Sequence, residues 1–395
     1  MPTYPTGKPG QLLLEILPSK MSGIYVHVPF CKQRCSYCDF YTGLNTQLIP
    51  DYIEALVAEL YKRKEYLPDK RIQSIYFGGG TPSVLSIQEF ERVFQGIRDI
   101  YRLEPQAEIT FEANPDDLTK EYLQQIKSLP FNRLSIGIQS FDNEALQGIN
   151  RRHTGEQAVE AVKTAQQAGF DNISIDLIYG LPGQTVDNWR QQIRKALRLD
   201  IQHISAYGLT YEEGTQLWLQ REKGLLQICP DEDMIAMYEI LINELSRKGF
   251  EAYEISNFAR AGYRSRHNSS YWKQIPYLGL GPSAHSFDLS SRQWNLASTQ
   301  QYIKALRQGG DFFEREELSL RDRYNDYVML SLRTSEGIDG NYLRSEFGTD
   351  WESYCLENIK SFIRTEKIHV CNGHFRLTKS GILISDHIMA TLMKV

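Results

Sequence analysis

The first half of the chain alternates between strand-like and helix-like hydrophobic patterns, and this alternation limits the possible folds more than any other feature. Short runs rich in β-branched and aromatic residues predict strands at 23–28, 71–77, 107–113, 133–140, 172–180 and 201–209. Apolar residues at helical spacing predict helices at 50–66, 86–100, 118–126, 142–149, 155–168 and 184–198. Such alternation predicts a parallel sheet covered by helices. Because six strands are too few for the closed eight-stranded barrel, we predict a partial (β/α)6 barrel.

Composition excludes several classes of protein. Of the 395 residues, 41% are hydrophobic and 24% are charged, as in ordinary globular proteins. A formal charge of -5 gives no reason to expect nucleic acid as a partner. No apolar run approaches the roughly 18 residues of a membrane span, and Glu15 interrupts the run near the N-terminus. The scattered placement of Cys229, Cys355 and Cys371 argues against a disulfide framework, so we expect a cytoplasmic protein.

The sequence divides into four predicted parts. They are an N-terminal tail at 1–20, a core barrel at 21–255, a loop-rich connector at 256–315 and a C-terminal domain at 316–395. In the last part, helical patterns at 321–333, 340–347 and 351–365 precede a hairpin around Asn372-Gly373 and a final helix from Lys379. This order predicts a small winged-helix-like domain. Its acidic and basic residues balance, so we expect a lid or docking role rather than DNA binding.

Three cysteines lie within eight residues, at Cys31, Cys35 and Cys38, with the spacing C-x3-C-x2-C. A disulfide would leave one of them unpaired. A structural zinc site needs four ligands, and His27 is a candidate for the fourth. A [4Fe–4S] cluster normally takes four cysteines, so three would leave one iron open to a small molecule. The spacing favours the cluster, and the other two interpretations stay open at this point.

Chemically active residues follow the predicted strands, where a parallel barrel forms its active site. Glu112, Gln139 and Asp176 come at or near the ends of three strands, and GGGTPS (78–83) ends another. The glycine run lacks the lysine of a phosphate loop, so it is either a tight turn or a place of close approach to a ligand. Glu112 and Asp176 suit hydroxyl or ammonium groups, and Arg151 suits a carboxylate. Solvated charges and turn caps are the alternatives.

Six motifs in a fixed order resemble a known family: YVHVPFCKQRCSYCDF, YFGGGTPS, FEANPD, RLSIGIQSF, INRRH and DLIYGLPGQT. Together the chain resembles the radical S-adenosylmethionine (SAM) superfamily, in its coproporphyrinogen III dehydrogenase branch. The resemblance implies a [4Fe–4S] cluster on the three cysteines, SAM on its open iron, and an electron donor such as flavodoxin or ferredoxin. It implies cofactor-binding roles for Tyr25, Tyr37, Gly79, Gly80, Thr81, Glu112, Gln139, Arg151 and Asp176.

Two further features resemble the related heme chaperones rather than the dehydrogenases. The dehydrogenases carry a further cysteine where this chain has Phe40. The segment His267–Trp272, HNSSYW, is similar to a motif associated with heme binding in the chaperones. This resemblance implies heme contacts by His267, Tyr271 and Trp272. Apart from the resemblance, His285 in GLGPSAHSF (279–287) is a second candidate near the porphyrin, with a buried structural histidine as the alternative. We therefore expect a heme-binding protein that delivers heme to an acceptor protein, with coproporphyrinogen III dehydrogenase as the rival function.

Overall fold

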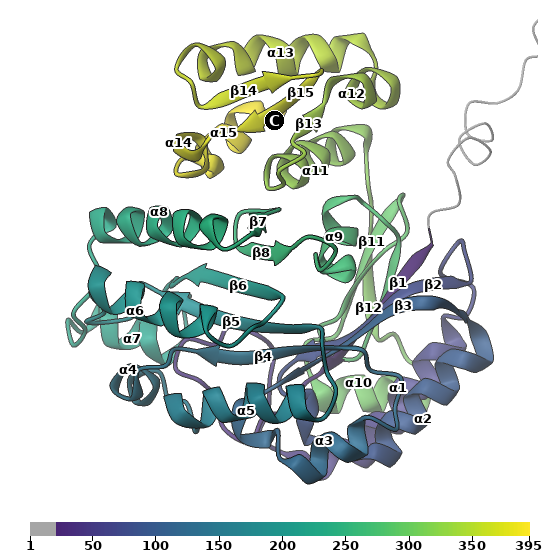
Figure 1. Cartoon of the computed structure of the whole chain (residues 1–395). Helices are drawn as coiled ribbons and strands as arrows, with labels where there is room; N and C mark the ends of the chain where they lie inside the picture. The colour runs from purple at the N-terminus through teal and green to yellow at the C-terminus, as the bar shows by residue number, and fades with distance from the viewer. Residues whose placement is uncertain (1–20) are drawn as a thin grey trace, which may run out of the picture.

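The structure is a computed structural model that describes residues 21–395. The predicted N-terminal tail at 1–20 lies outside them. Figure 1 shows a curved sheet with helices on its outer face, and a smaller lobe at the C-terminal end of the chain. Within residues 21–395, no helix is both long and apolar enough to cross a membrane.

Six adjacent parallel strands form the core, in sequence order from β1 to β6. Each crossover between neighbouring strands contains at least one helix, which confirms the predicted partial barrel. The strands are β1 (Ser22–Val28), β2 (Arg71–Gly79), β3 (Arg102–Ala113), β4 (Arg133–Gln139), β5 (Ile173–Tyr179) and β6 (His203–Gly208). The crossover helices are α1 (Ile49–Lys62), α2 (Ile87–Ile100), α3 (Lys120–Ile126), α4 (Asn143–Gly148), α5 (Gly155–Gln167) and α6 (Val186–Leu197).

Local sequence explains why these helices form and which face they bury. At α2, Ser86 and Glu89 form a capping box that satisfies amide groups of the first turn. The helix then buries Phe90 and Phe94, whose rings meet Phe77 of β2 at centroid distances of 5.3 Å. Such aromatic packing holds α2 on the sheet.

The segment predicted as a loop-rich connector has more regular structure than expected. It adds strands to both edges of the barrel, with β9 parallel to β1 and β8 antiparallel to β6. The motif HNSSYW is helical, and Glu108 of β3 accepts hydrogen bonds from the first amides of that helix at 3.0 Å. The elements are β8 (Asn257–Arg260), α9 (Arg266–Trp272), β9 (Tyr277–Leu280), β10 (His285–Phe287), β11 (Ser291–Asn295), α10 (Thr299–Gln308) and β12 (Phe313–Glu317). Between β6 and β8 lie α7 (Gln216–Glu222), α8 (Asp231–Arg247) and β7 (Phe250–Ala252).

The C-terminal part has a hydrophobic core of its own, distinct from that of the barrel. Its three-stranded sheet has the order β13-β15-β14, so the predicted hairpin gains a third strand. The final helix that was predicted to start at Lys379 is divided into two short helices in the structure. The elements are α11 (Leu320–Leu332), β13 (Ile338–Asp339), α12 (Gly340–Phe347), α13 (Thr349–Arg364), β14 (Ile368–Cys371), β15 (His374–Leu377), α14 (Lys379–Ile382) and α15 (Ser385–Leu392). Helices followed by a small sheet agree with the predicted winged-helix-like architecture.

Candidate functional site

The three clustered cysteines line one cavity at the carboxyl ends of the barrel strands. We call it the cysteine cavity, and its volume is about 580 Å³. Of the cofactor-binding residues that the radical SAM resemblance implies, all except Tyr25 lie on its wall: Tyr37, Gly79, Gly80, Thr81, Glu112, Gln139, Arg151 and Asp176. The fold therefore brings together residues that are up to 145 positions apart in the sequence (31 to 176).

The three thiol groups differ in their surroundings. Within residues 21–395, no group of three His, Cys, Asp or Glu side chains converges on one metal-ion position. Burial raises the pKa of the Cys38 thiol to about 11, and the guanidinium of Arg151 lies 3.3 Å from the Cys35 sulfur. Cluster binding would therefore release the proton of the Cys38 thiol.

His27 does not supply a fourth ligand in this structure. Its two ring nitrogens lie 3.0 Å from the Tyr25 hydroxyl and 2.9 Å from the Tyr41 carbonyl oxygen. It is buried and is absent from the lining of the cysteine cavity. The zinc alternative that uses His27 thus gains no support from the geometry.

The glycine run sets the position of the cysteine loop. A Cβ atom at Gly79, where φ is +103°, would lie 2.5 Å from the His27 ring, and one at Gly80 would lie 2.6 Å from the Phe30 carbonyl oxygen. The Gly80 amide donates to Val28 at 2.9 Å. There is no room for a side chain at Gly79 or Gly80, so the glycine run is a tight turn that also lines the cavity.

Two carboxyl groups face the cavity in surroundings that disfavour their charged forms. Desolvation raises the pKa of Glu112 to about 7, although the Tyr76 hydroxyl donates to its carboxylate at 2.6 Å. Desolvation also raises the pKa of Asp176, which accepts from Ser135 at 3.4 Å. Buried carboxylates with spare acceptor capacity can bind the hydroxyl or ammonium groups of a polar ligand.

Arg151 and Gln139 complete this wall. The Arg151 guanidinium donates to Asn114 at 2.7 Å and to the Gly137 carbonyl, and its Nε is buried without a partner among the described residues. Gln139 ends β4 in a left-handed conformation, with φ of +65°, which is uncommon for a residue other than glycine. Backbone strain of this kind is often found at ligand sites.

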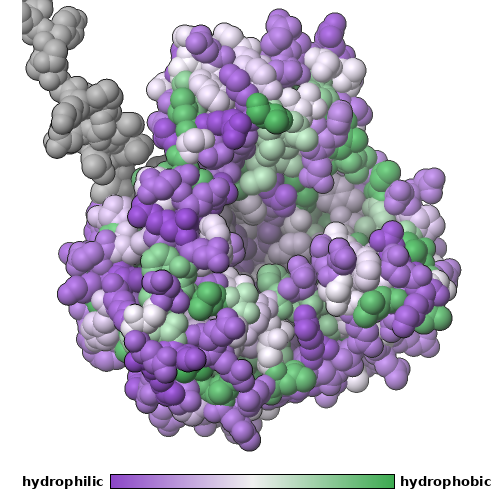
Figure 2. Space-filling view, turned by 180° about the vertical axis from the view of Figure 1, so that it is seen from behind, coloured by the Kyte–Doolittle hydropathy of each residue, from purple (hydrophilic) through white to green (hydrophobic). Residues whose placement is uncertain are grey.

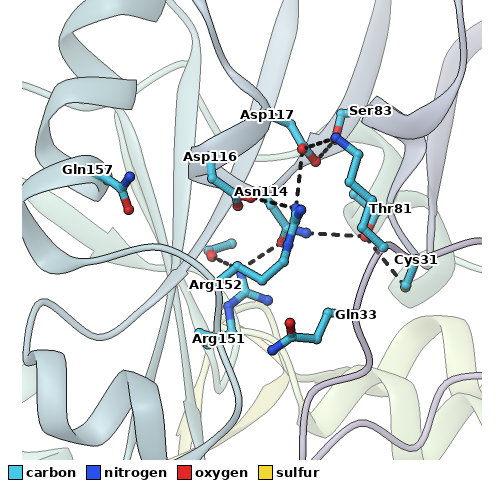
Figure 3. Close-up of polar contacts among 12 residues, drawn as sticks. Cys31, Gln33, Thr81, Ser83, Asn114, Asp116, Asp117, Arg151, Arg152 and Gln157 are labelled. Carbon is cyan, nitrogen blue, oxygen red and sulfur yellow. Dashed lines mark hydrogen bonds and ion pairs between the residues drawn. The ribbon is translucent and has the colours of Figure 1, made fainter. Parts of the chain in front are cut away.

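The sequence analysis missed Asn114 on the cavity wall and three residues that support the cysteine loop from outside the cavity: Lys32, Asp117 and Arg152. Asn114 bonds both Arg151 and Thr81, and Thr81 donates to the Cys31 sulfur at 3.5 Å. The buried Asp117 carboxylate accepts from Lys32 at 2.7 Å and from Arg152 at 3.2 Å (Figure 3). These bonds tie the cysteine loop to the segments that follow β2 and β3 and to the loop between α4 and α5. The position of Asn114 and Asp117 just after a strand was the available signal.

A second cavity of about 580 Å³ adjoins the first. Asp39 and Phe40, next to Cys38, line both. We call this second space the aromatic cavity, because its wall contains Tyr25, Phe40, Tyr271, Trp272, Tyr277 and Phe287. Met329 and Leu330 of α11 also line it. Figure 2 shows that the surface is hollowed between the C-terminal lobe and the barrel. The structure therefore places Tyr25, Tyr271 and Trp272 here.

His267 is not on the wall of either cavity. It is 1% exposed, with its ring nitrogens 2.9 Å from the Ser74 hydroxyl and 2.8 Å from the Tyr271 hydroxyl. Burial lowers the pKa of His267 to about 3, so the ring is neutral. A neutral imidazole has one donor and one acceptor nitrogen, and both are in use. The predicted role of His267 as a heme ligand would require these bonds to break.

The fold and the three-cysteine cavity define the class of protein. A profile of the radical SAM superfamily matches residues 25–196, and one of the HemN C-terminal domain matches residues 318–384. Coproporphyrinogen III oxidase (HemN) from Escherichia coli superposes with a TM-score of 0.83 at 22% identity, covering 96% of this chain and 92% of that one. At that identity the likeness establishes the fold. Membership of this superfamily implies a [4Fe–4S] cluster and SAM.

Sequence relatives identify the branch. Heme chaperone HemW of Lactococcus lactis is 35% identical, over 93% of this chain and 96% of the relative. HemW of Bacillus subtilis is 32% identical, over 94% of this chain and 99% of the relative. The mitochondrial radical S-adenosyl methionine domain-containing protein 1 of Danio rerio is 37% identical, over 94% of this chain and 87% of the relative. The chain belongs to the HemW family.

Proposed function

We propose that this protein is a heme chaperone, which binds heme and delivers it to an acceptor protein. The observation that carries the proposal is the aromatic cavity beside the cysteine cavity, in a chain of the HemW family. Flat aromatic walls supply the large apolar contact area that a porphyrin needs. A cytoplasmic location is part of the proposal, and the absence of disulfides among the six cysteines, all within residues 21–395, supports it.

The cysteine cavity is the proposed site of the two cofactors. Cys31, Cys35 and Cys38 would hold the cluster, and the Glu112, Gln139, Arg151 and Asp176 wall would hold SAM. Bound together, the two groups supply one-electron reductive chemistry, for which an electron donor such as flavodoxin or ferredoxin is needed. The protein's own part is to desolvate the site and to orient polar groups toward SAM.

Phe40 argues against the dehydrogenase alternative. Its side chain is 66% exposed at the border of the two cavities, where the resemblance places a cysteine in the dehydrogenases. A phenyl ring offers neither a metal ligand nor a group that transfers protons or electrons. We therefore expect little or no conversion of coproporphyrinogen III by the protein with its cluster and SAM in place.

A heme-transfer assay tests the proposed function. The reconstituted full chain is loaded with hemin, separated from free hemin, and mixed with apomyoglobin as an acceptor whose absorbance reports heme uptake. We expect a stable Soret band and transfer of heme, with no protoporphyrinogen formed from coproporphyrinogen III in a parallel assay. Failure to bind hemin, or substantial protoporphyrinogen production, would overturn the proposal.

The SAM site gives a separate prediction. Glu112→Ala and Asp176→Ala should each weaken SAM binding roughly ten- to a hundredfold, about 1.5–3 kcal/mol, while iron content stays normal. Since the pKa of Glu112 is raised to about 7, affinity in the native protein should also fall as the pH drops through that value. Calorimetry measures both effects. Glu160→Ala, at an exposed position of α5, is the matched control, and unchanged affinity in both site variants would disprove the assignment.

A further inference from the structure

Heme needs an iron ligand as well as apolar walls, and the structure limits which histidine can serve. Three histidines lie in or near the aromatic cavity: His27, His267 and His285. The ring nitrogens of His27 and His267 are all engaged in hydrogen-bonding distances within the protein, and both side chains are buried. Either ring would have to give up a buried hydrogen bond to reach iron, which is costly.

His285 differs from both. It lies on the wall of the aromatic cavity as the exposed first residue of β10, and within residues 21–395 neither ring nitrogen has a hydrogen-bond partner. Its nearest ring neighbour is Trp294, at 6.3 Å between centroids.

The backbone under His285 is fixed although its side chain is free. A Cβ atom at Gly279 would lie 1.9 Å from the His285 carbonyl oxygen, so β9 and β10 are in close contact there. His285 also pairs with Trp294 of β11. A ligand held on such a strand has a defined position, as metal ligands require. Removing the exposed imidazole should leave this backbone intact.

The cavity also contains one cation. Arg292 of β11 is the only lysine or arginine among the described residues of its lining, and it forms an ion pair with Asp326 of α11. A heme propionate could pair with the same guanidinium in place of, or beside, Asp326. Heme and the C-terminal domain would then share Arg292, at the interface that the cavity occupies.

We propose that the aromatic cavity is the heme site, with His285 as an axial ligand of the iron and Arg292 as the partner of a propionate. This inference rests on the proposed heme-binding function and names its site. It assigns His267 a positioning role, because His267 holds the Tyr271 hydroxyl at 2.8 Å on the cavity wall and stacks on Tyr76 at 5.1 Å.

Hemin titration of the full chain tests the ligand, read from the Soret band. His285→Ala should shift the band toward that of unligated hemin and weaken binding. Removing a residue that only hydrogen-bonds to a metal ligand typically lowers metal affinity roughly 10–100-fold. Since His285 would bind the iron directly, we expect its removal to lower hemin affinity by at least that factor. Added imidazole should restore the band position, which a structural defect would not allow. His369→Ala, an exposed histidine on β14, is the control and should bind as the native protein does.

The propionate contact is tested with the dimethyl ester of heme. Arg292→Gln should weaken the binding of hemin but not of the ester, whose carboxylates are blocked. If the native protein binds hemin and His285→Ala leaves the Soret band unchanged, the assignment of the ligand is wrong while the chaperone proposal stands. If the native protein binds no hemin, the proposed function itself fails.

Discussion

Replacing any one of Cys31, Cys35 and Cys38 with alanine should abolish reconstitution of the [4Fe–4S] cluster. The three sulfurs line one cavity, and in a cube each would hold a different iron. A cube with only two protein ligands would expose two irons to solvent and be lost. Anaerobic reconstitution followed by assay of iron and sulfide, together with the charge-transfer absorbance, measures the loss in each variant.

The remaining cysteines provide matched controls for this experiment. Cys371→Ala removes a half-buried thiol on β14, in the C-terminal domain, and should leave iron content at the native value. Cys355 is a poor control because it is fully buried in the C-terminal core, where alanine would leave a void. Native iron and sulfide in all three cluster variants would contradict the assignment.

The barrel could be predicted from the sequence because its signals are local. Each core strand is a run of β-branched and aromatic residues, and each crossover helix has apolar residues at helical spacing. The largest error in a strand boundary is at β3, which begins at Arg102, whereas the predicted strand begins at residue 107. The first residues of β3, RLEPQ, are mostly polar and contain a proline, so they lack the hydrophobic pattern that predicts a strand. The strand ends, which position the site, were predicted well.

The connector could not be predicted because its strands depend on distant partners. Strands β9 to β12 are three to five residues long, too short for a clear period. β9 pairs with β1, so that Gly23 lies opposite Tyr277 across 254 positions of sequence (23 to 277). The same reason explains His267: the motif gave the residue types, whereas the bonds to Ser74 and Tyr271 appear only when β2 and α9 are packed together.

A buried acidic residue of α1 holds this connector to the barrel. Glu59 is fully buried, and its carboxylate accepts hydrogen bonds from Arg63 at 3.1 Å, Gly281 at 2.9 Å and Asn295 at 2.8 Å, and from the Tyr302 hydroxyl. Removing one member of a buried ion pair leaves the other charge uncompensated, which costs about 3–5 kcal/mol. Glu59→Ala should therefore lower the free energy of unfolding by about that amount.

Urea unfolding of the native chain and two variants on the same helix measures this effect. Glu54→Ala, an exposed change that removes surface ion pairs with Arg92 and Arg307, should cost only about 0–1 kcal/mol. The urea midpoint of Glu59→Ala should therefore be well below the midpoint of Glu54→Ala. Because Gly281 and Asn295 flank the strand that carries His285, hemin binding should weaken in Glu59→Ala and stay native in Glu54→Ala. Equal midpoints for the two variants would mean that α1 does not anchor the connector through Glu59.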